Sequence, residues 1–267
     1  MGGMFRSNKE LANLTKNLTL LTAYRLVGTI PCRRYRESRI MEKIQPDPAT
    51  RHSKTRLLDA ALHAIRAKGY AATTVDDICR EAGVTKGSFF HHFRSKDDLA
   101  LGAVAHWRAM TEGLFAAEHY HQPRDPLARL LGYLDFRAAI LSGELSDYTC
   151  LLGTLVQETY ATHPAIRAAC DQALSSHIDT LTRDVQAAKE LYAADAPWSA
   201  ESVGSFIQAV LQGSFIFAKA QQGPAVIRLN LEHLRRYLCS LLPVTASTPA
   251  GPEGLRQDYS THSHYTD

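Results

Sequence analysis

The sequence lacks the features that mark several large classes of protein. Its 267 residues contain five cysteines, odd in number and widely scattered, so neither a disulfide framework nor a zinc-ligand spacing is present. No apolar run approaches the length that spans a bilayer, and the cluster from Leu18 to Leu21 is cut off by Arg25, too early for a signal-peptide core. We therefore expect a cytoplasmic protein without a membrane partner.

Catalytic signatures are missing too. The chain has no Gly-rich phosphate loop, no Gly-x-Ser-x-Gly elbow and no His-Glu-x-x-His motif. Glu118 and His121 form a single Glu-x-x-His, whereas a di-metal helical bundle needs two such motifs and further carboxylates. His262 and His264 stand without partners near the C-terminus. The sequence thus predicts that the protein is not an enzyme and holds neither a metal nor a cofactor.

What the chain does have is helical periodicity. Alternation of the β type is not sustained anywhere, whereas apolar residues recur at helical spacing over most of the chain. Glycine and proline interrupt this pattern near Pro123, Gly143, Pro164 and Pro224, and a helix is expected from about Tyr148 to Ala161. The predicted fold class is all-α, with about nine helices.

The sharpest local pattern lies in residues 73–96, which predict two short helices around a glycine turn. Thr74 is a good N-cap, and Asp77 three positions later can close a capping box with it. Gly83 supplies the left-handed residue that ends this helix. Thr85 caps the next helix, which is only about two turns long and must therefore be held by packing.

Apolar stripes show how these helices pack. Gly69 ends an upstream helix, and Ser95 opens a third element with a Ser-x-x-Asp box to Asp98. The stripes of the first two helices consist of Leu58, Ala61, Leu62 and Ile65, and of Val75, Ile78, Cys79 and Ala82. Three helices that share one small core around a glycine turn form a helix-turn-helix, which places its second helix in the DNA major groove.

The segment from about Lys54 to Leu99 resembles the DNA-binding domain of the TetR/AcrR family of one-component transcriptional repressors. The resemblance rests on the sequence from Val84 to Phe93, followed by Lys96. The rest of the chain, to about Pro243, also fits the family in length and helical pattern. It implies an N-terminal three-helix helix-turn-helix domain and a larger helical bundle for ligand binding and dimerisation. It further implies a homodimer that binds a palindromic operator in double-stranded DNA and is released by a small-molecule effector.

The same resemblance implies which residues contact DNA. Thr74 and Lys96 are expected to hold phosphates, while Phe89 and Phe93 pack inward. Phe90 replaces the tyrosine common in the family, so a phosphate hydrogen bond is lost and apolar contact, for example with a thymine methyl group, remains. The complete expected set is Thr74, Thr85, Lys86, Gly87, Ser88, Phe90, His91, His92 and Lys96.

The distribution of charge along the chain agrees with a DNA-binding segment at residues 51–96. Residues 51–96 carry nine lysines and arginines against four acids, whereas residues 97–267 carry twelve against nineteen. Neutralisation of phosphates supplies much of the affinity of a DNA-binding protein, and an acidic body is repelled by the duplex. The asymmetry therefore favours DNA binding over a basic surface that has no partner.

The expected domains follow from these patterns. Residues 51–98 form the DNA-binding domain, residues 99–243 the ligand-binding and dimerisation domain, and residues 244–267 a disordered tail. Residues 1–50 are expected to be a disordered extension, with Met41 as a possible true start of translation. The alternative is that this extension is a basic arm that contacts DNA.

The last two expected helices carry the clearest packing pattern outside the helix-turn-helix. An a/d seam in the last helix and an apolar stripe in the one before predict a dimer interface of four helices, two from each subunit. The alternative is that both stripes cover only the protomer's own core. The expected interface residues are Phe206, Val210, Ile227, Leu231, Leu234 and Leu238.

Aromatic residues between Trp107 and Phe217 are expected to line a pocket for the effector, unless they are simply core. The expected lining is Trp107, Phe115, Tyr133, Phe136, Cys150, Thr154 and Phe206. Cys150 lies at an expected helix start, which favours its thiolate, so an alternative function is a repressor that senses electrophiles or oxidants through cysteine. Against this, a single core cysteine is often an inert small hydrophobe. A helical-bundle enzyme fused to a degenerate DNA-binding domain is the third hypothesis.

Overall fold

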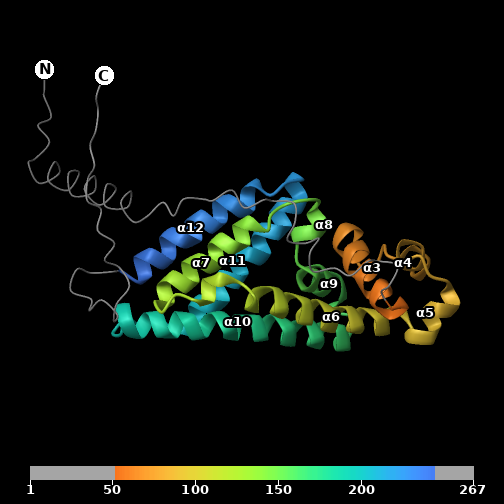
Figure 1. The fold of residues 1–267 in the computed structure, drawn as a ribbon, viewed down its shortest axis with the longest axis horizontal. Helices are drawn as coiled ribbons and strands as arrows, with labels where there is room; N and C mark the ends of the chain where they lie inside the picture. Colours follow the sequence, from red (N-terminus) through yellow and green to blue (C-terminus); the bar gives the residue numbers. More distant parts are fainter. Residues whose placement is uncertain (1–51, 244–267) are drawn as a thin grey trace, which may run out of the picture. The chain divides into compact units, whose positions relative to one another are not determined.

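The computed structural model describes residues 52–243 (Figure 1). The predictions for residues 1–50, including a start at Met41, and for residues 244–267 lie outside the described residues.

The described residues form ten α-helices and one short 3-10 helix, without a β-strand, so the all-α prediction is confirmed. Figure 1 shows α3, α4 and α5 gathered at one end, next to α8 and α9. The elements are α3 Ser53–Lys68, α4 Val75–Ala82, α5 Lys86–His92, α6 Lys96–Ala116, η2 His119–His121, α7 Pro126–Ala139, α8 Leu145–Tyr148, α9 Leu151–Thr159, α10 Pro164–Tyr192, α11 Ala200–Gln221 and α12 Ala225–Leu241.

The helix expected from Tyr148 to Ala161 begins later than predicted. Tyr148 instead ends the short helix α8, which a reciprocal capping box between Glu144 and Asp147 starts. Thr149 then takes an extended backbone conformation, and its hydroxyl donates to the carbonyl of Leu145 at 2.6 Å. This break separates α8 from α9 and accounts for a tenth helix where about nine were expected.

The helix ends around the glycine turn are as predicted. Thr74 accepts a hydrogen bond from the backbone of Asp77, whose carboxylate accepts one in return. Gly83 adopts φ 60° and ψ 40°, the left-handed conformation that ends α4 without the steric cost of a Cβ atom. The hydroxyl of Thr85 accepts from the backbone N–H of Ser88 at 3.2 Å and caps α5.

The start of α6 differs slightly from the predicted box. Ser95 accepts from the backbone N–H of Asp98 at 3.1 Å, as expected for an N-cap. The carboxylate of Asp98, however, accepts from the backbone N–H of Arg94 at 2.9 Å, one residue before the cap. The carboxylate of Asp98 therefore binds the residue before the N-cap instead of the N-cap itself.

Two hydrophobic cores organise the described chain. The first joins α3 to α6 with α9 and the start of α10, and includes the fully buried residues Leu57, Ile78, Phe89 and Leu155. The helices of the expected DNA-binding domain therefore share one core with α9 and the start of α10. The second core lies among α6, α7, α10, α11 and α12, and Cys150 packs against both.

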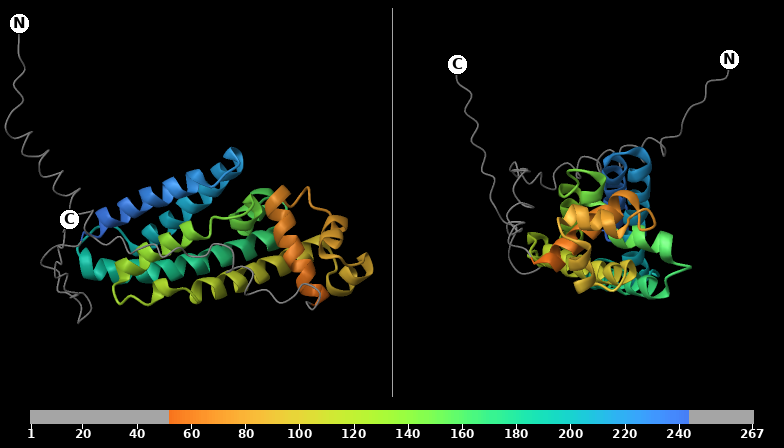
Figure 2. Two further views of the ribbon diagram at one scale, coloured as in Figure 1. Left: turned by 45° about the horizontal axis from the view of Figure 1, so that its top comes forward. Right: turned by 90° about the vertical axis from the view of Figure 1, so that its right-hand side faces the viewer.

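The seam on α12 covers the protomer's own core, which corrects the expected dimer interface. Figure 2 shows α12 running beside α11, against which it packs. The four seam residues in question are between 0% and 4% exposed and belong to the second core, so they are not available to another subunit; they are Ile227, Leu231, Leu234 and Leu238. Periodicity showed that this face is buried but not against which partner.

Helix α11 is more apolar than the sequence pattern predicted. By length and composition alone, α11 is long and apolar enough to cross a membrane, and it is the one such helix among residues 52–243. Nearly half of its best window is buried inside the protein, and the helix packs against α10 and α12. A core helix has the same properties, so we assign α11 to the core.

Candidate nucleic-acid interface

Helix α5 is anchored on one side and open on the other. Phe89 is fully buried and Phe93 is 4% exposed, as expected, and their rings lie 5.9 Å apart in the first core. Phe90 points outward and is 57% exposed. Its ring therefore lies on the solvent-facing side of α5, where it is free to contact a partner.

An arginine that the sequence analysis did not single out fixes the turn before α5. Arg56 on α3 donates from its guanidinium to the carbonyl of Ala82, with Nε at 2.9 Å, and to the carbonyl of Gly83 at 2.6 Å. These carbonyls have no partner within α4 because they lie at its C-terminal end. The guanidinium therefore ties α3 to the glycine turn and sets the direction in which α5 leaves it. Arg56 is one of several cations in this segment, and the sequence gives no local signal that distinguishes it.

Lys86 stands at the exposed start of α5. Its ammonium lies 2.8 Å from the carboxylate of Asp76 on α4, and both side chains are more than half exposed. The hydrogen bond to Asp76 raises the pKa of Lys86, so the lysine is cationic near neutral pH. A surface pair of this kind contributes little to stability and can be exchanged for a phosphate.

The two histidines at the end of α5 face different surroundings. His91 is exposed, whereas the Nε2 atom of His92 lies 2.6 Å from the hydroxyl of Ser53 on α3. Burial lowers the pKa of His92, and the nearby His91, His52 and Lys54 lower it further. His91 is thus the freer of the two to approach a base edge.

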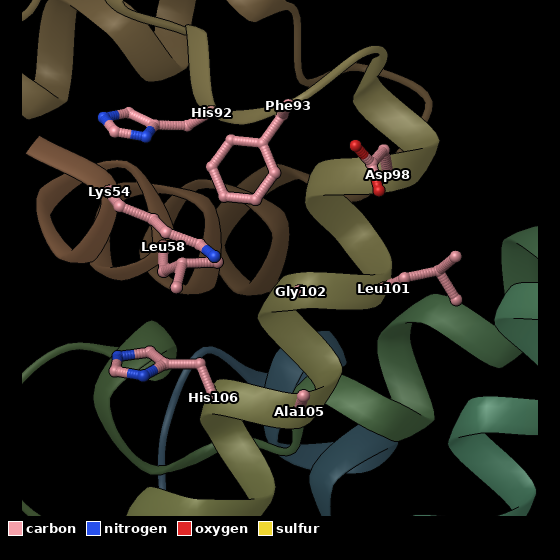
Figure 3. A pocket seen from close by; sticks show the side chains of 9 residues that line it. All are labelled: Lys54, Leu58, His92, Phe93, Asp98, Leu101, Gly102, Ala105 and His106. Carbon is pink, nitrogen blue, oxygen red and sulfur yellow. The ribbon is translucent and has the colours of Figure 1, made fainter.

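A hollow of about 390 Å³ lies beside this end of α5, between α3 and α6 (Figure 3). The ammonium of Lys54 lies 5.8 Å from the centre of the Phe93 ring, at the rim that carries His92. The hollow is open to solvent and mixes charged with apolar groups. It is lined by Lys54, Leu58, His92, Phe93, Asp98, Leu101, Gly102, Ala105 and His106.

Lys96 is already engaged within the protein. Its ammonium donates to the carbonyls of Tyr70 and Thr73, each at 3.1 Å, and lies 4.2 Å from the centre of the Tyr70 ring. It therefore holds the loop that leads into the capped start of α4 at Thr74. A phosphate contact by Lys96, which the resemblance implied, stays a prediction.

The structure brings several of the expected ligand-binding residues together. The ring of Phe115 on α6 lies 5.8 Å from that of Tyr133 and 5.5 Å from that of Phe136, both on α7. His177 of α10 was not predicted, yet its Nε2 atom lies 3.0 Å from the hydroxyl of Tyr133. Burial, with a smaller contribution from the charge of Arg137, lowers the pKa of His177 to about 3, so this imidazole is neutral.

The other expected ligand-binding residues lie elsewhere. Cys150 and Thr154 meet at the start of α9, where the Thr154 hydroxyl donates to the Cys150 carbonyl at 3.0 Å. Trp107 packs against the first core. Phe206 is 44% exposed on α11, with its ring 4.9 Å from that of Tyr237, so the structure does not bring it into the aromatic cluster.

These observations define a class of protein. A capped two-turn helix, held on its inner side and bearing an aromatic, a lysine and a histidine on its outer side, is the recognition helix of a helix-turn-helix DNA-binding protein. Among residues 52–243, no group of three or more histidines, cysteines or acids is placed to hold a metal ion.

Comparison with known proteins extends this assignment to a family. Residues 57–103 match the family described as bacterial regulatory proteins, tetR family, and residues 126–233 match the C-terminal domain of LmrA/YxaF-like transcriptional regulators. The transcriptional regulator AcuR of Cereibacter sphaeroides is 32% identical over 155 residues, which cover 57% of this chain and 70% of that protein. The chain belongs to the TetR family of transcriptional regulators, whose members are DNA-binding proteins rather than enzymes.

Two further relatives show how far the likeness extends. An HTH-type transcriptional regulator of Lactococcus lactis is 26% identical over 185 residues, which cover 69% of this chain and 92% of that protein. The crystal structure of a regulatory protein TetR from Rhodobacter sphaeroides matches with a TM-score of 0.63 at 24% identity, covering 69% of this chain and 98% of the other. The structural match supports the fold.

Proposed function

We propose that the protein is a ligand-responsive repressor that binds a palindromic operator as a homodimer and leaves it when a small effector binds. The observation that carries the DNA-binding part is the two-sided helix α5, buried at Phe89 and exposed at Phe90 and His91. An outward aromatic and imidazole on a rigidly capped helix can contact base edges, while Lys86 neutralises a phosphate. The proposed DNA contacts are Thr74, Thr85, Lys86, Gly87, Ser88, Phe90, His91, His92 and Lys96.

A second surface supports the dimer. The outer faces of α11 and α12 carry large apolar side chains that are 37% to 56% exposed, namely Phe206, Ile216, Phe217, Leu229 and Tyr237. A Cβ atom at Gly213 on α11 would meet nothing within 4 Å, so the same surface offers room for close approach of another helix. We place the interface on this outer face. Of the six residues expected in the interface, Phe206 and the partly buried Val210 remain part of it. Two-fold symmetry would then present two copies of α5 to two half-sites.

In vitro selection tests this function. The full chain should enrich an inverted repeat from a random pool of double-stranded DNA, and binding to it should weaken steeply with salt. Lys189→Ala, on α10 away from α5, should leave the enriched sequence unchanged and serves as the control for loss of a cation. Enrichment of no sequence, or binding that does not depend on salt, would contradict the proposal.

A specific observation also favours the cysteine-sensing alternative. Cys150 lies close enough to the cations of Arg66 and Lys219 to interact electrostatically with both. Burial raises the pKa of Cys170 to about 12, so that thiol is a suitable unreactive reference. If Cys150 is the sensor, it should be modified faster than Cys170, and modification should release DNA from the wild type but not from Cys150→Ser. Equal reaction rates would leave reversible effector binding as the better account.

A further inference from the structure

Two cations meet where α3, α9 and α11 come together, and neither forms an ion pair among residues 52–243. Arg66 donates to two backbone carbonyls, at 3.0 and 3.2 Å, and its guanidinium lies 4.9 Å from the centre of the Trp107 ring. Lys219 donates to the hydroxyl of Thr154 at 2.8 Å. The two cations are close enough that Arg66 lowers the pKa of Lys219.

This placement costs the free protein stability. Burial lowers the pKa of Arg66 to about 10, although the charge of Asp147 offsets part of this effect without forming an ion pair, and burial also lowers the pKa of Lys219. Glu158 raises the pKa of Lys219, but its carboxylate oxygens accept hydrogen bonds from the backbone of Tyr70 and Ala71 instead. Cations kept partly buried without a paired carboxylate indicate a site for an anion.

A neutral donor faces the same junction. Gln212 lies seven residues before Lys219 on α11, and therefore on the same face of the helix. Its Nε2 atom is buried and has no hydrogen-bond partner. The Oε1 atom of Gln208, one turn earlier, is also buried and has no partner. A Cβ atom at Gly153 on α9 would lie 2.3 Å from Gln212 Oε1, so the glycine makes room for this amide. Buried donors without partners are rare in folded proteins and call for an explanation.

We propose that Lys219, Arg66 and Gln212 bind the carboxylate of a small organic acid, which acts as the effector. The guanidinium supplies a fork of parallel donors, the ammonium supplies a point charge, and the amide donates to the remaining lone pair. Cys150 and Trp107, which pack against the adjoining core, form an apolar wall for the rest of the molecule. The role as effector rests on the proposed function, whereas binding of the carboxylate does not.

Thermal unfolding of the full chain tests the site without DNA. The probes are sodium propionate, butyrate and benzoate, the three corresponding amides, and inorganic phosphate, all at constant ionic strength. At about 100-fold excess over Kd, a carboxylate that binds should raise Tm by about 5 °C. The amides, which lack the charge, should give no shift. Equal shifts from acids and amides, a shift from phosphate alone, or no shift from any carboxylate would overturn the proposal.

Matched variants locate the binding. Lys219→Gln should abolish the carboxylate shift, because the glutamine keeps a donor for Thr154 but not the charge. The control is Lys189→Gln, which removes a lysine of α10 that donates to a backbone carbonyl at 2.7 Å outside this site, and it should retain the full shift. A shift that survives in Lys219→Gln would place the carboxylate elsewhere. If a carboxylate binds the wild type but does not release the selected DNA, the proposal of a carboxylate site stands and the proposed effector response is contradicted.

Discussion

The carboxylate of Glu158 accepts a hydrogen bond from the backbone N–H of Tyr70 at 3.1 Å, and a second from that of Ala71 at 2.8 Å. Glu158 belongs to α9, whereas Tyr70 lies in the loop between α3 and α4. Gly69 makes the approach possible, since it adopts φ 90° and a Cβ atom there would lie 2.4 Å from the carboxylate. A shift of α9 would therefore be transmitted directly to the loop that leads into the helix-turn-helix.

Replacing this carboxylate should loosen the loop. In Glu158→Ala both backbone donors lose their partner, so we expect the free energy of unfolding to fall by about 1–3 kcal/mol. Hydrogen exchange at Tyr70 and Ala71 should become faster than in the wild type. Glu190→Ala is the control, since Glu190 on α10 bonds only the side chain of Gln186, at 2.7 Å. Unchanged exchange at both amides would show that Glu158 does not hold the loop.

Neighbouring phenylalanines on α5 should separate folding from binding. Phe89 fills the first core, so Phe89→Ala should lower the free energy of unfolding by about 3–5 kcal/mol in urea denaturation. Phe90 is 57% exposed, so Phe90→Ala should change stability by no more than about 0.5 kcal/mol and should weaken binding to the selected DNA. Equal losses of stability in both variants would contradict an α5 that faces the core with Phe89 and solvent with Phe90.

The lysines that begin α5 and α6, Lys86 and Lys96, should behave differently. Lys86→Gln should weaken binding to all sequences alike and reduce the slope of log affinity against log salt by about 0.9 for each phosphate that the lysine neutralises. Lys96 is bonded to two carbonyls of the preceding loop, so Lys96→Gln should also lower the free energy of unfolding, by about 1 kcal/mol. Denaturation and salt titrations on both variants check this. A stability loss confined to Lys86→Gln would reverse the assignment.

His177 should make the protein sensitive to mild acid. Burial lowers its pKa in the folded state to about 3, against 6.5 for an unperturbed histidine. Below pH 6.5 the unfolded chain gains a proton that the folded chain excludes, so stability is lost as pH falls from about 6.5 toward about 3, by up to about 1.4 kcal/mol per pH unit. His177→Gln should flatten this decline in urea denaturation curves. His233→Gln, on the exposed face of α12, should leave it unchanged. Parallel curves for wild type and His177→Gln would contradict the placement.

The outer face of α11 should control assembly. Phe217 is 56% exposed in the protomer, so Phe217→Glu should fold normally but sediment as a monomer. Leu191→Glu introduces the same charge at a residue of α10 that is 44% exposed and should leave the dimer intact. A dimeric Phe217→Glu, or a monomeric wild type, would remove this face from the interface.

Local features of the fold were predictable because they depend on neighbours in sequence. The caps at Thr74 and Thr85 and the left-handed Gly83 need only residues within one turn, and each is confirmed. The partner of a buried face is a long-range property, so the seam on α12 predicted burial but not that the protomer itself covers it. The pairing of Tyr133 with His177 joins residues 44 apart in the chain, which no local pattern signals.

The most direct test of the central claim, that α5 reads base pairs in a symmetric dimer, is to repeat the DNA selection with His91→Ala. His91 is exposed at the end of α5 and, in this account, contacts a base edge. The variant should enrich an inverted repeat of the same spacing in which preference is relaxed at one position of each half-site, related by the two-fold axis. An unchanged base preference in His91→Ala and Phe90→Ala alike, or a change in one half-site alone, would contradict the account.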